Sequence, residues 1–390
     1  MKISLALVLL SSTIIFAQNI KKAGIIIDSK TNLPLPFVSI YFEENINNNN
    51  TGSISNENGE FSFDIQNVKK IIFSHINYEQ ISVDLSTDFS TIKLVPKTFE
   101  LDEIIISNES PQNYLKKIIN NSEGRIEKNM LLKSFCRETV QINNEITKFS
   151  DALIDYYVRK GNGKSNVVMQ QHRAFGKSKN TDEEDSKLEA INSAFDVKNH
   201  VTDSYDFQVI KNLLKSDDYE FERKIKKDNN GVEYEYVAIT PNANSNELLN
   251  TGHIIIDPKT KSIIEFKIYT SQNHLKNAKL VNILIAKVRL NKTMNWSKFK
   301  TIDNNYVLMF NKKEIDLYIK MGNKVDHSFA FKNDLFVYEF KNDTEIPDSN
   351  YSKKTIFQAG TKYFSNYWSD YNVFPINEIE KDFISANQVK

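Results

Sequence analysis

Thr31-Asn32-Leu33-Pro34-Leu35-Pro36-Phe37-Val38-Ser39-Ile40 is the stretch that says most about the fold of this chain. Pro34 and Pro36 keep the backbone extended around Leu35, because the residue before a proline avoids the helical region. Residues 37–41 continue as a run of aromatic and β-branched residues, which is typical of a strand. The stretch therefore predicts an extended segment that leads into a β-strand.

The residues around this stretch predict a small β-sandwich. Asn58-Gly59 predicts a type I′ hairpin turn, since both residue types tolerate a positive φ. Phe61 and Phe63 follow in alternation, which places both rings on one face of a strand. Further strands are expected at residues 23–27, 71–73, 80–85 and 90–94. We expect about seven short strands between residues 24 and 107.

Three further motifs follow the opening stretch: Ser55-Asn56-Glu57-Asn58-Gly59-Glu60-Phe61-Ser62-Phe63, Ile72-Phe73-Ser74-His75-Ile76-Asn77-Tyr78 and Leu101-Asp102-Glu103-Ile104-Ile105-Ile106. Together these motifs resemble the carboxypeptidase-regulatory-like domain, a transthyretin-like sandwich that is common in secreted proteins of Bacteroidota. Asn77 stands where that family has Gly, and Asn is the next most tolerant residue at positive φ. The last motif resembles the exit strand of that family.

The resemblance implies a non-catalytic module at residues 18–107. In that family the domain often precedes a TonB-dependent receptor with its plug and barrel. Too little chain follows Ser107 to form a 22-stranded transporter barrel. The receptor interpretation is therefore rejected.

Residues 1–17 are expected to be a secretory signal peptide. Lys2 supplies a positive charge, an apolar run extends from Ile3 to Phe16, and cleavage is expected after Ala17. The run is shorter than the ~20 residues of a spanning helix, and no Cys follows it to carry a lipid. The sequence thus predicts an exported protein, periplasmic or associated with the outer membrane, without a transmembrane helix in the mature chain.

Charge composition limits the classes of binding partner, and the cysteine content limits disulfide formation. The chain has 50 Lys and Arg against 50 Asp and Glu, which argues against broad binding to nucleic acid or anionic membranes. Its 40% hydrophobic content suffices for a packed core. Cys136 is the one cysteine, so no internal disulfide is expected, and its position in an apolar strand predicts a buried thiol.

Residues 108–129 are expected to form a bridging helix. Ser110 can cap the N-terminus, and Pro111 suits the first helical position. The helix is expected to extend to Ile126. Its apolar face is expected to consist of Tyr114, Leu115, Ile118 and Ile119.

Residues 130–390 are expected to form a larger antiparallel β-rich domain, which makes the whole chain mainly β with a few helices. A helical insertion is expected near residues 180–218, with short helices at 187–195 and 205–215. The expected strands cover residues 135–142, 146–159, 219–227, 232–239, 252–257, 262–269, 280–290, 298–302, 306–312, 314–321 and 329–340.

The segment from Gly252 to Phe266 resembles, weakly, the hairpin of periplasmic lipoprotein-carrier half-barrels, which hold lipid in an open curved sheet. An Asp257-Pro258 turn explains the same pattern without a ligand. Adjacent charges at Lys312-Lys313-Glu314 favour a soluble sheet over a small membrane barrel. An open half-barrel, a closed sheet and a membrane barrel all stay open as interpretations.

Candidate catalytic, cofactor-binding and metal-binding motifs were sought, and none is predicted. Gly163-Lys164-Ser165 lacks the earlier Gly of a phosphate loop, because that position is Val158. The Asp228-Asn229-Asn230-Gly231 turn lacks the bidentate Glu of a calcium loop. The six His residues, at positions 75, 172, 200, 253, 274 and 327, show no metal-binding spacing.

Aromatic pairs are the other signal. Tyr156-Tyr157, Tyr363-Phe364 and Tyr367-Trp368 fit a sugar-stacking surface, but aromatic residues are also ordinary members of a β-sheet core. The core interpretation is favoured. The tail from Tyr367 to Val373 resembles C-terminal segments of uncharacterised Bacteroidota proteins that carry the same N-terminal module.

The sequence therefore favours a non-catalytic cell-envelope protein, a binding or accessory module for a protein, glycan or lipid. A first alternative is a periplasmic carrier of a lipid or other hydrophobic ligand, which predicts a concave apolar cavity in residues 130–345. A second is a secreted hydrolase with a dispersed active site, which predicts that His172, His200, His253 and His327 gather with carboxylates. No ligand, activity or oligomeric state is indicated.

Overall fold

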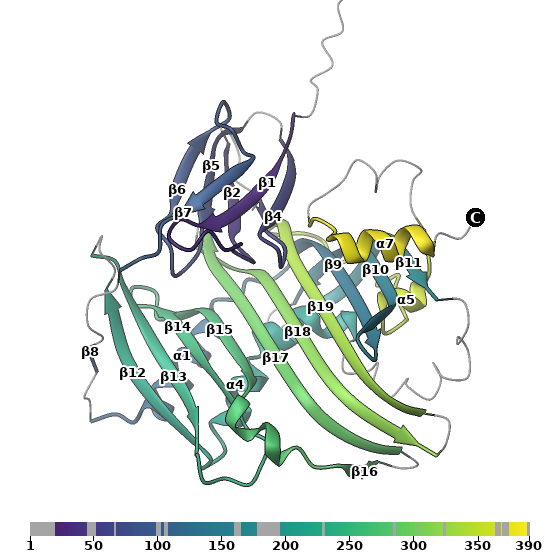
Figure 1. The fold of residues 1–390 in the computed structure, drawn as a ribbon. Coiled ribbons are helices and arrows are strands. Elements are labelled where there is room, and N and C mark those ends of the chain that lie inside the picture. The colour runs from purple at the N-terminus through teal and green to yellow at the C-terminus, as the bar shows by residue number, and fades with distance from the viewer. Residues whose placement is uncertain are drawn as a thin grey trace, which may run out of the picture.

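The computed structural model describes residues 20–44, 52–65, 68–98, 103–104, 108–159, 165–177, 196–227, 231–283, 286–302, 304–322, 325–362, 368 and 374–387. The protein is mainly β, with a small N-terminal sandwich, a large antiparallel sheet and few helices, as predicted (Figure 1). The expected signal peptide (1–17), the residues of the phosphate-loop-like turn (160–164) and the expected helix at 187–195 lie outside the described residues. So do residues 228–230, Tyr363, Phe364 and Tyr367.

The N-terminal sandwich contains the seven expected strands. They are β1 (Ile20–Asp28), β2 (Ser39–Glu44), β3 (Ser53–Ile54), β4 (Glu60–Ile65), β5 (Val68–Ser74), β6 (Ile81–Asp84) and β7 (Thr91–Leu94). One sheet has the order β4-β1-β7 and the other β3-β2-β5-β6. Phe61, Phe63 and Phe73 pack between the two sheets, so the alternation in β4 faces the core as predicted.

The Asn58-Gly59 turn does not close a hairpin, and this prediction is wrong. β3 before the turn pairs with β2, whereas β4 after it pairs with β1, so the turn carries the chain between the two sheets. Of the two turn residues Asn58 and Gly59, only Gly59 has a positive φ, 74°. The turn is held by Asn56, whose Oδ1 accepts hydrogen bonds from the backbone N–H groups of Asn58 and Glu60, both at 2.9 Å. The positive φ expected at Asn77 is not found either.

The large sheet is antiparallel throughout and has the order β11-β10-β9-β19-β18-β17-β15-β14-β13-β12-β8, with β16 paired to β17. Its strands are β8 (Glu103–Ile104), β9 (Met130–Ile142), β10 (Glu145–Val158), β11 (Ser165–Gly176), β12 (Tyr219–Lys227), β13 (Glu233–Pro241), β14 (Asn250–Asp257), β15 (Ser262–Thr270), β16 (Val281–Ile283), β17 (Ala286–Ile302), β18 (Asn305–Met321) and β19 (Val325–Lys341).

Three strand predictions are corrected by these pairings. Residues 280–290 are not one strand but parts of β16 and β17, which pair with each other. The segments expected at 306–312 and 314–321 are one continuous strand, β18. The exit strand expected at the end of the sandwich, at 101–106, is reduced to β8, which pairs with β12 in the large sheet.

The helices are α1 (Pro111–Gly124), η2 (Val197–Asn199), α3 (His200–Tyr205), α4 (Gln208–Leu213), η3 (Gln272–Asn277), α5 (Ile356–Ala359) and α7 (Glu378–Ala386). Ser110 caps α1 as predicted, accepting a hydrogen bond from the backbone N–H of Asn113. The helix ends two residues before Ile126. Of the helices that the structure describes, none is both long and apolar enough to cross a bilayer.

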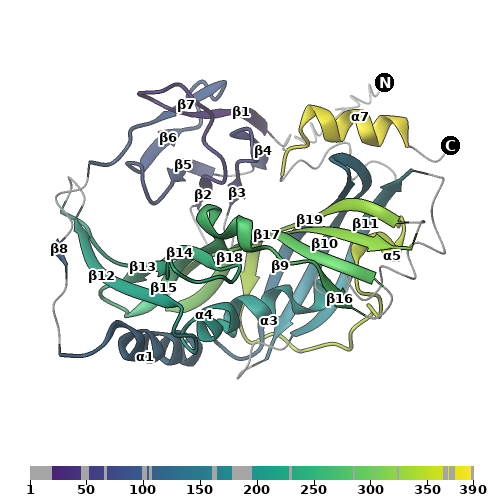
Figure 2. The ribbon, with the colours of Figure 1, turned by 60° about the horizontal axis from the view of Figure 1, so that its bottom comes forward.

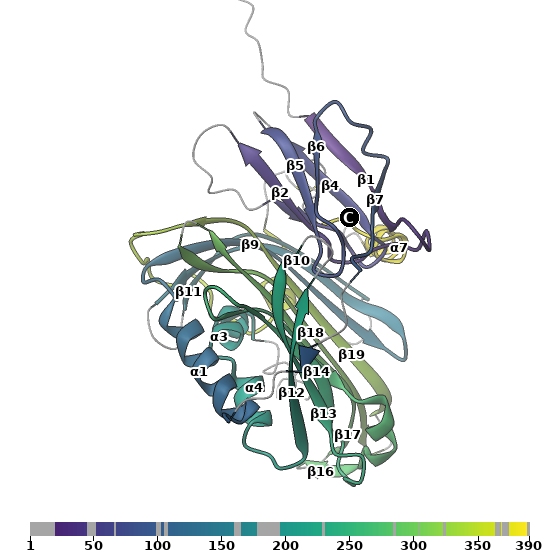
Figure 3. The ribbon, with the colours of Figure 1, turned by 90° about the vertical axis from the view of Figure 1, so that its left-hand side faces the viewer.

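The molecule has three layers. The sandwich and α7 lie on one face of the large sheet, and α1, α3 and α4 lie on the other (Figure 2). The sheet curves around these three helices (Figure 3). Tyr205 and Phe207 are fully buried there against Phe299 of β17, so described side chains fill this side of the sheet.

The core also contains the predicted buried thiol. Cys136 is 1% exposed, and burial raises the pKa of its thiol to about 12, so the reactive thiolate is absent near neutral pH. Tyr156 is fully buried beside it, with its hydroxyl oxygen 3.8 Å from the sulfur of Cys136. Trp368 is also buried, at 7% exposure. Both residues belong to the core, as favoured from the sequence.

Candidate functional site

The sandwich is anchored on the large sheet by Phe37, within the stretch quoted first. Phe37 is 6% exposed, and its ring centroid lies 5.3 Å from those of Trp296 and Phe310. Its φ is 56°, an unusual value for an aromatic residue, and this backbone turn follows directly after Pro36. The carbonyl oxygen of Phe37 accepts a hydrogen bond of 2.8 Å from Lys298 Nζ. One aromatic side chain thus joins the two β units.

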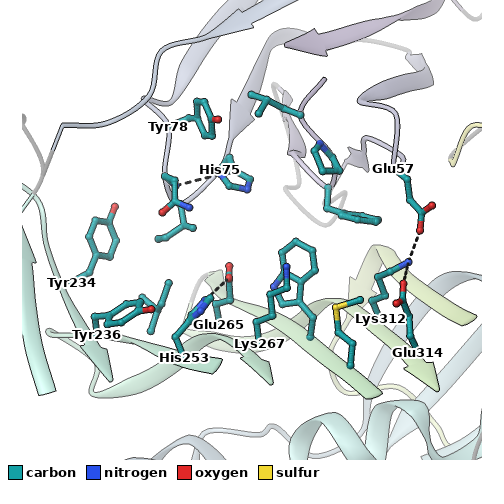
Figure 4. Close-up of a pocket in the computed structure, with 18 of the residues that line it drawn as sticks. Glu57, His75, Tyr78, Tyr234, Tyr236, His253, Glu265, Lys267, Lys312 and Glu314 are labelled. Carbon is teal, nitrogen blue, oxygen red and sulfur yellow. Dashed lines mark hydrogen bonds and ion pairs between the residues drawn. The ribbon is translucent and has the colours of Figure 1, made fainter. Parts of the chain in front are cut away.

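A cavity of about 620 Å³ lies beside this anchor, between the sandwich and the sheet (Figure 4). Its volume is in the range of small-molecule sites. The sandwich contributes residues 35–37, the turn after β3 and the loop after β5, and the sheet contributes β12, β13, β14, β15, β17 and β18. The labelled side chains around it are Glu57, His75, Tyr78, Tyr234, Tyr236, His253, Glu265, Lys267, Lys312 and Glu314.

The floor of the cavity is part of a row of directly opposed residues that crosses the sheet. Directly paired residues in an antiparallel sheet share one face, so each pairing extends the row by one strand. From β14 to β11 the row is His253, Lys267, Trp296, Lys312, Asp334, Arg137, Asp151 and Arg173. From Lys312 onward the charges alternate, which gives every cation an acidic neighbour.

Lys312 lies at the centre of a buried charge cluster. Its Nζ is 2.9 Å from Glu57, 3.1 Å from Asp334 and 3.3 Å from Glu314. Burial alone lowers the pKa of this lysine, but the three carboxylates outweigh burial and raise it. Because Glu57 belongs to the sandwich, the cluster ties the two β units together through charge.

Lys267 and Lys298 differ from Lys312 in their surroundings. Their Nζ atoms lie 4.3 Å and 4.6 Å from the ring centroid of Trp296. Within the part of the chain that the structure describes, neither ammonium group forms an ion pair with a carboxylate. Burial lowers the pKa of Lys267, and it lowers that of Lys298 to about 8. The site therefore holds positive charge that the surrounding described residues do not pair.

The nearby acid, Glu265, is bonded elsewhere. Its Oε1 lies 3.2 Å from Nε2 of His253, and the ring of His253 stacks on Tyr236 at 5.3 Å. Burial raises the pKa of Glu265, but its interactions with His253 and Lys298 lower it below its ordinary value. Glu265 is thus ionised, and its charge raises the pKa of both Lys267 and Lys298 without an ion pair to either.

His75, from the loop of the sandwich, is neutral in this setting. The pKa of His75 is lowered to about 3, chiefly by burial and then by the charges of Lys298 and Lys267, which outweigh the opposing charge of Glu265. Its Nδ1 faces the backbone N–H of Asn77 at 3.3 Å. Beside it, Tyr78 donates a hydrogen bond of 2.8 Å to Asp28. Burial is thus the main reason that the imidazole is neutral, and the two lysine charges add to it.

Lys267 gives the cavity a cationic group that can bind an anion. No Ser, Thr or Cys occurs among the described residues that line the cavity, whereas the hydroxyl groups of Tyr78, Tyr234 and Tyr236 do line it. No group of three or more His, Cys, Asp or Glu side chains that could hold a metal ion occurs in the described ranges. The predicted lack of catalytic, cofactor-binding and metal-binding residues stays a prediction.

The histidines named for the hydrolase alternative are not gathered. His253 lines the cavity, but His172 bonds to the carbonyl of Gly360, and His200 is buried against Asn333. His327 lies near Asn143. The second histidine of the cavity, His75, was not part of that expected set.

The cavity was not predicted from the sequence, because its walls come from separate strands. A local signal does exist in the alternation of Glu265 with Lys267, where polar residues at period two mark one face of β15. Nothing in that pattern tells which strand lies opposite. The pairing of Lys267 with Trp296 spans 29 positions of sequence, and it only appears in the folded sheet.

Comparison with solved structures gives matches with low TM-scores and low sequence identity. A lipovitellin structure on lipid–protein interactions shares 8% identity, covers 62% of this chain and 28% of its own, and has a TM-score of 0.28. A DUF1329 family protein from Desulfovibrio piger shares 9% identity, covers 61% of this chain and 96% of its own, and has a TM-score of 0.28. A LolA superfamily protein from Nitrosomonas europaea shares 9% identity, covers 61% and 97%, and has a TM-score of 0.23. TM-scores this low carry no argument about a ligand.

No curated protein matches this sequence. A family model does match its N-terminal part, over residues 23–106. These residues include all but the start of β1, every other strand of the sandwich, and β8. The model is that of the CarboxypepD_reg-like domain, which agrees with the resemblance read from the motifs of the N-terminal sandwich.

Proposed function

We propose that this protein is a non-catalytic accessory protein of the cell envelope whose interdomain cavity binds a small organic anion. Export through residues 1–17 and a Bacteroidota origin are part of the proposal, and they rest on the N-terminal sequence and on the resemblance of the sandwich. The binding role rests on one observation above all, the half-buried Lys267 in the cavity wall without a described carboxylate partner.

An uncompensated ammonium group in a partly dry site is costly, because the charge has lost water without gaining a counter-charge. Cation–π contact with Trp296 offsets only part of this cost. A carboxylate or similar anion bound at Lys267 would supply the missing partner. The charges of Lys267 and Lys298, which add to the effect of burial in lowering the pKa of His75, favour an anion at the same place.

The lining also limits the kind of ligand. The cavity is walled by aromatic rings, but the ring of Tyr236 is covered by His253 and Lys226, and that of Trp296 by two lysines. Little ring surface is left for stacking. A compact polar anion therefore fits better than a large flat or purely apolar molecule.

The carrier alternative is less well supported by the packing. It expects an apolar cavity on the curved side of the large sheet, where Tyr205, Phe207 and Ile210 are fully buried. Described side chains occupy that side. The cavity beside Phe37 is instead lined by charges, which suits an ionic ligand.

Calorimetric titration of the full chain tests the proposed function. The probes are hexuronic acids and short peptides with a free carboxylate, each compared with its neutral counterpart, the hexose or the peptide amide. We expect one acid series to bind and its neutral counterpart not to bind, and Lys267→Met to weaken binding about 10- to 100-fold. Lys259→Met, an exposed lysine on the adjacent β14–β15 turn, is the matched control.

If every acid binds no better than its neutral counterpart, the proposed function is wrong. If an acid binds but Lys267→Met binds it equally well, the anion site lies elsewhere and the assignment to this cavity is wrong. The two series of probes separate a sugar acid from a peptide carboxylate as the source of the anion.

A further inference from the structure

One segment of this neutral chain is strongly basic. Residues 266–302 contain seven Lys and one Arg and no Asp or Glu, although the whole chain has equal numbers of both charges. The sequence therefore places a local excess of positive charge on η3, β16, β17 and the end of β15. The exposed part of this positive charge lies at the start of β17 and is separate from the anion cavity.

The same segment holds most of the exposed apolar side chains. Ten large hydrophobic side chains are exposed among the described residues, and six of them lie between residues 269 and 290. Leu280, Val281 and Ile283 are 47%, 49% and 52% exposed. The other three are Tyr269, Leu275 and Leu290. Apolar exposure concentrated in one place marks an interaction surface.

The β16–β17 hairpin separates its apolar and basic side chains. Val281 pairs with Val288 and Ile283 with Ala286, whereas Lys287 pairs with Asn282. Because successive residues of a strand point to opposite faces, Val281 and Ile283 share one face and Lys287 lies on the other. The hairpin is an amphipathic ribbon at the end of the sheet remote from the sandwich (Figure 1).

The cations around this hairpin are exposed and mostly unneutralised. Lys276, Lys279, Lys287 and Arg289 are all exposed. Lys279 pairs with Glu247 at 2.7 Å, and Arg289 bonds to the neutral Asn291. For Lys276 and Lys287 the structure gives no acidic partner among the described residues.

We propose that residues 269–283 and 286–290 dock the protein on the surface of an anionic lipid bilayer. Val281 and Ile283 enter the boundary between headgroups and acyl chains, and the neighbouring cations lie against lipid phosphates. Each kind of side chain alone would bind weakly, and the two together are the usual combination for interfacial binding.

A second copy of this chain fits the surface less well. A two-fold contact would bring the same patch of each copy together. Residues 266–302 have eight cations and no acid, so such a contact would face like charges with like. Charge complementarity therefore selects the anionic bilayer over self-association.

Co-sedimentation of the full chain with vesicles tests this proposal. We expect binding to phosphatidylcholine vesicles that contain about 30% phosphatidylglycerol, weak or no binding to pure phosphatidylcholine, and loss of binding above roughly 0.5 M salt. The double variant Lys276→Gln/Lys287→Gln should lower partitioning about 25-fold, and Val281→Ser/Ile283→Ser should lower it about 10-fold.

Ile379→Ser and Lys259→Gln are the matched controls, because both residues are exposed outside the patch and Ile379 is 71% exposed. Both controls should bind as the unchanged chain does. Equal binding to neutral and anionic vesicles would overturn the proposal, as would unchanged binding of both double variants. A dimer in analytical ultracentrifugation that Val281→Ser/Ile283→Ser dissociates would replace it with self-association.

Discussion

Lys267 and Lys312 lie directly opposite Trp296 on its two neighbouring strands, and their surroundings differ sharply. Lys312 is 1% exposed and has three carboxylates within 3.3 Å. Lys267 lies on the face of Trp296 and has no carboxylate partner among the described residues. Lysines on the two strands next to Trp296 thus have different roles. Lys312 holds the two β units together, and Lys267 is left available for a ligand.

Removing Lys312 should have the largest effect on the fold. In Lys312→Met three carboxylates lose their shared cation, so we expect the free energy of unfolding to fall by about 3–5 kcal/mol. Urea denaturation followed by circular dichroism measures this. Lys332→Met is the control, since Lys332 lies 3.9 Å from Glu57 at the edge of the cluster and should cost about 1 kcal/mol or less. Equal losses in both variants would mean that the cluster at Lys312 is not special.

Phe37→Ala tests whether packing contributes as much as charge to the same junction. The ring is buried among Trp296 and Phe310, so we expect a loss of about 3 kcal/mol and faster proteolysis between the sandwich and the large sheet. Phe37→Leu retains apolar volume and should lose less than half as much. If Phe37→Ala leaves the rate of cleavage unchanged, the junction is held by the charge cluster instead.

The pH dependence of stability should report the potential near Lys267. The pKa of His75 is lowered in the fold to about 3 from an ordinary 6.5, so the unfolded chain binds more protons between these values. Stability from this group is therefore complete above about pH 6.5 and declines as the pH falls toward 3. We expect the unchanged chain to lose about 2 kcal/mol more than His75→Gln between pH 7 and pH 5. Parallel pH profiles in urea denaturation would contradict this.

The sequence predicted features that depend on near neighbours. Three such features follow from residues within a few positions of each other: the alternation of Phe61 and Phe63, the Ser110 cap, and the short connection between β9 and β10. The error at Asn58-Gly59 shows the limit of such reasoning. The turn residues are local, but the partner of each flanking strand is not, and the two strands join different sheets.

Buried charge shows the same limit more clearly. The adjacent charges at Lys312-Lys313-Glu314 favour a soluble sheet over a small membrane barrel, and in the structure all three side chains are buried. Lys312 is covered by Glu57 of the sandwich on one face, and Lys313 contacts Asp203 of α3 on the other. Glu57 and Asp203 are each more than a hundred positions away in sequence from the lysine that they contact, so the polar pattern alone could not reveal these contacts.

Lys267→Met gives the smallest change in stability and the sharpest test of the comparison. Met has a similar shape, and it replaces an uncompensated half-buried charge with an apolar side chain on Trp296. We therefore expect the free energy of unfolding to stay level or rise by about 1 kcal/mol, whereas the same exchange at Lys312 lowers it.

The direction of this change distinguishes a binding lysine from a structural one. A residue retained for a ligand stabilises the complex, and its loss in the free protein costs nothing. In Lys267→Met binding of the organic anion should therefore weaken about 10- to 100-fold while the midpoint of urea denaturation is unchanged or higher. A lower midpoint, as large as that of Lys312→Met, would show that Lys267 has a counter-charge in the fold, and the contrast between the two lysines would no longer hold.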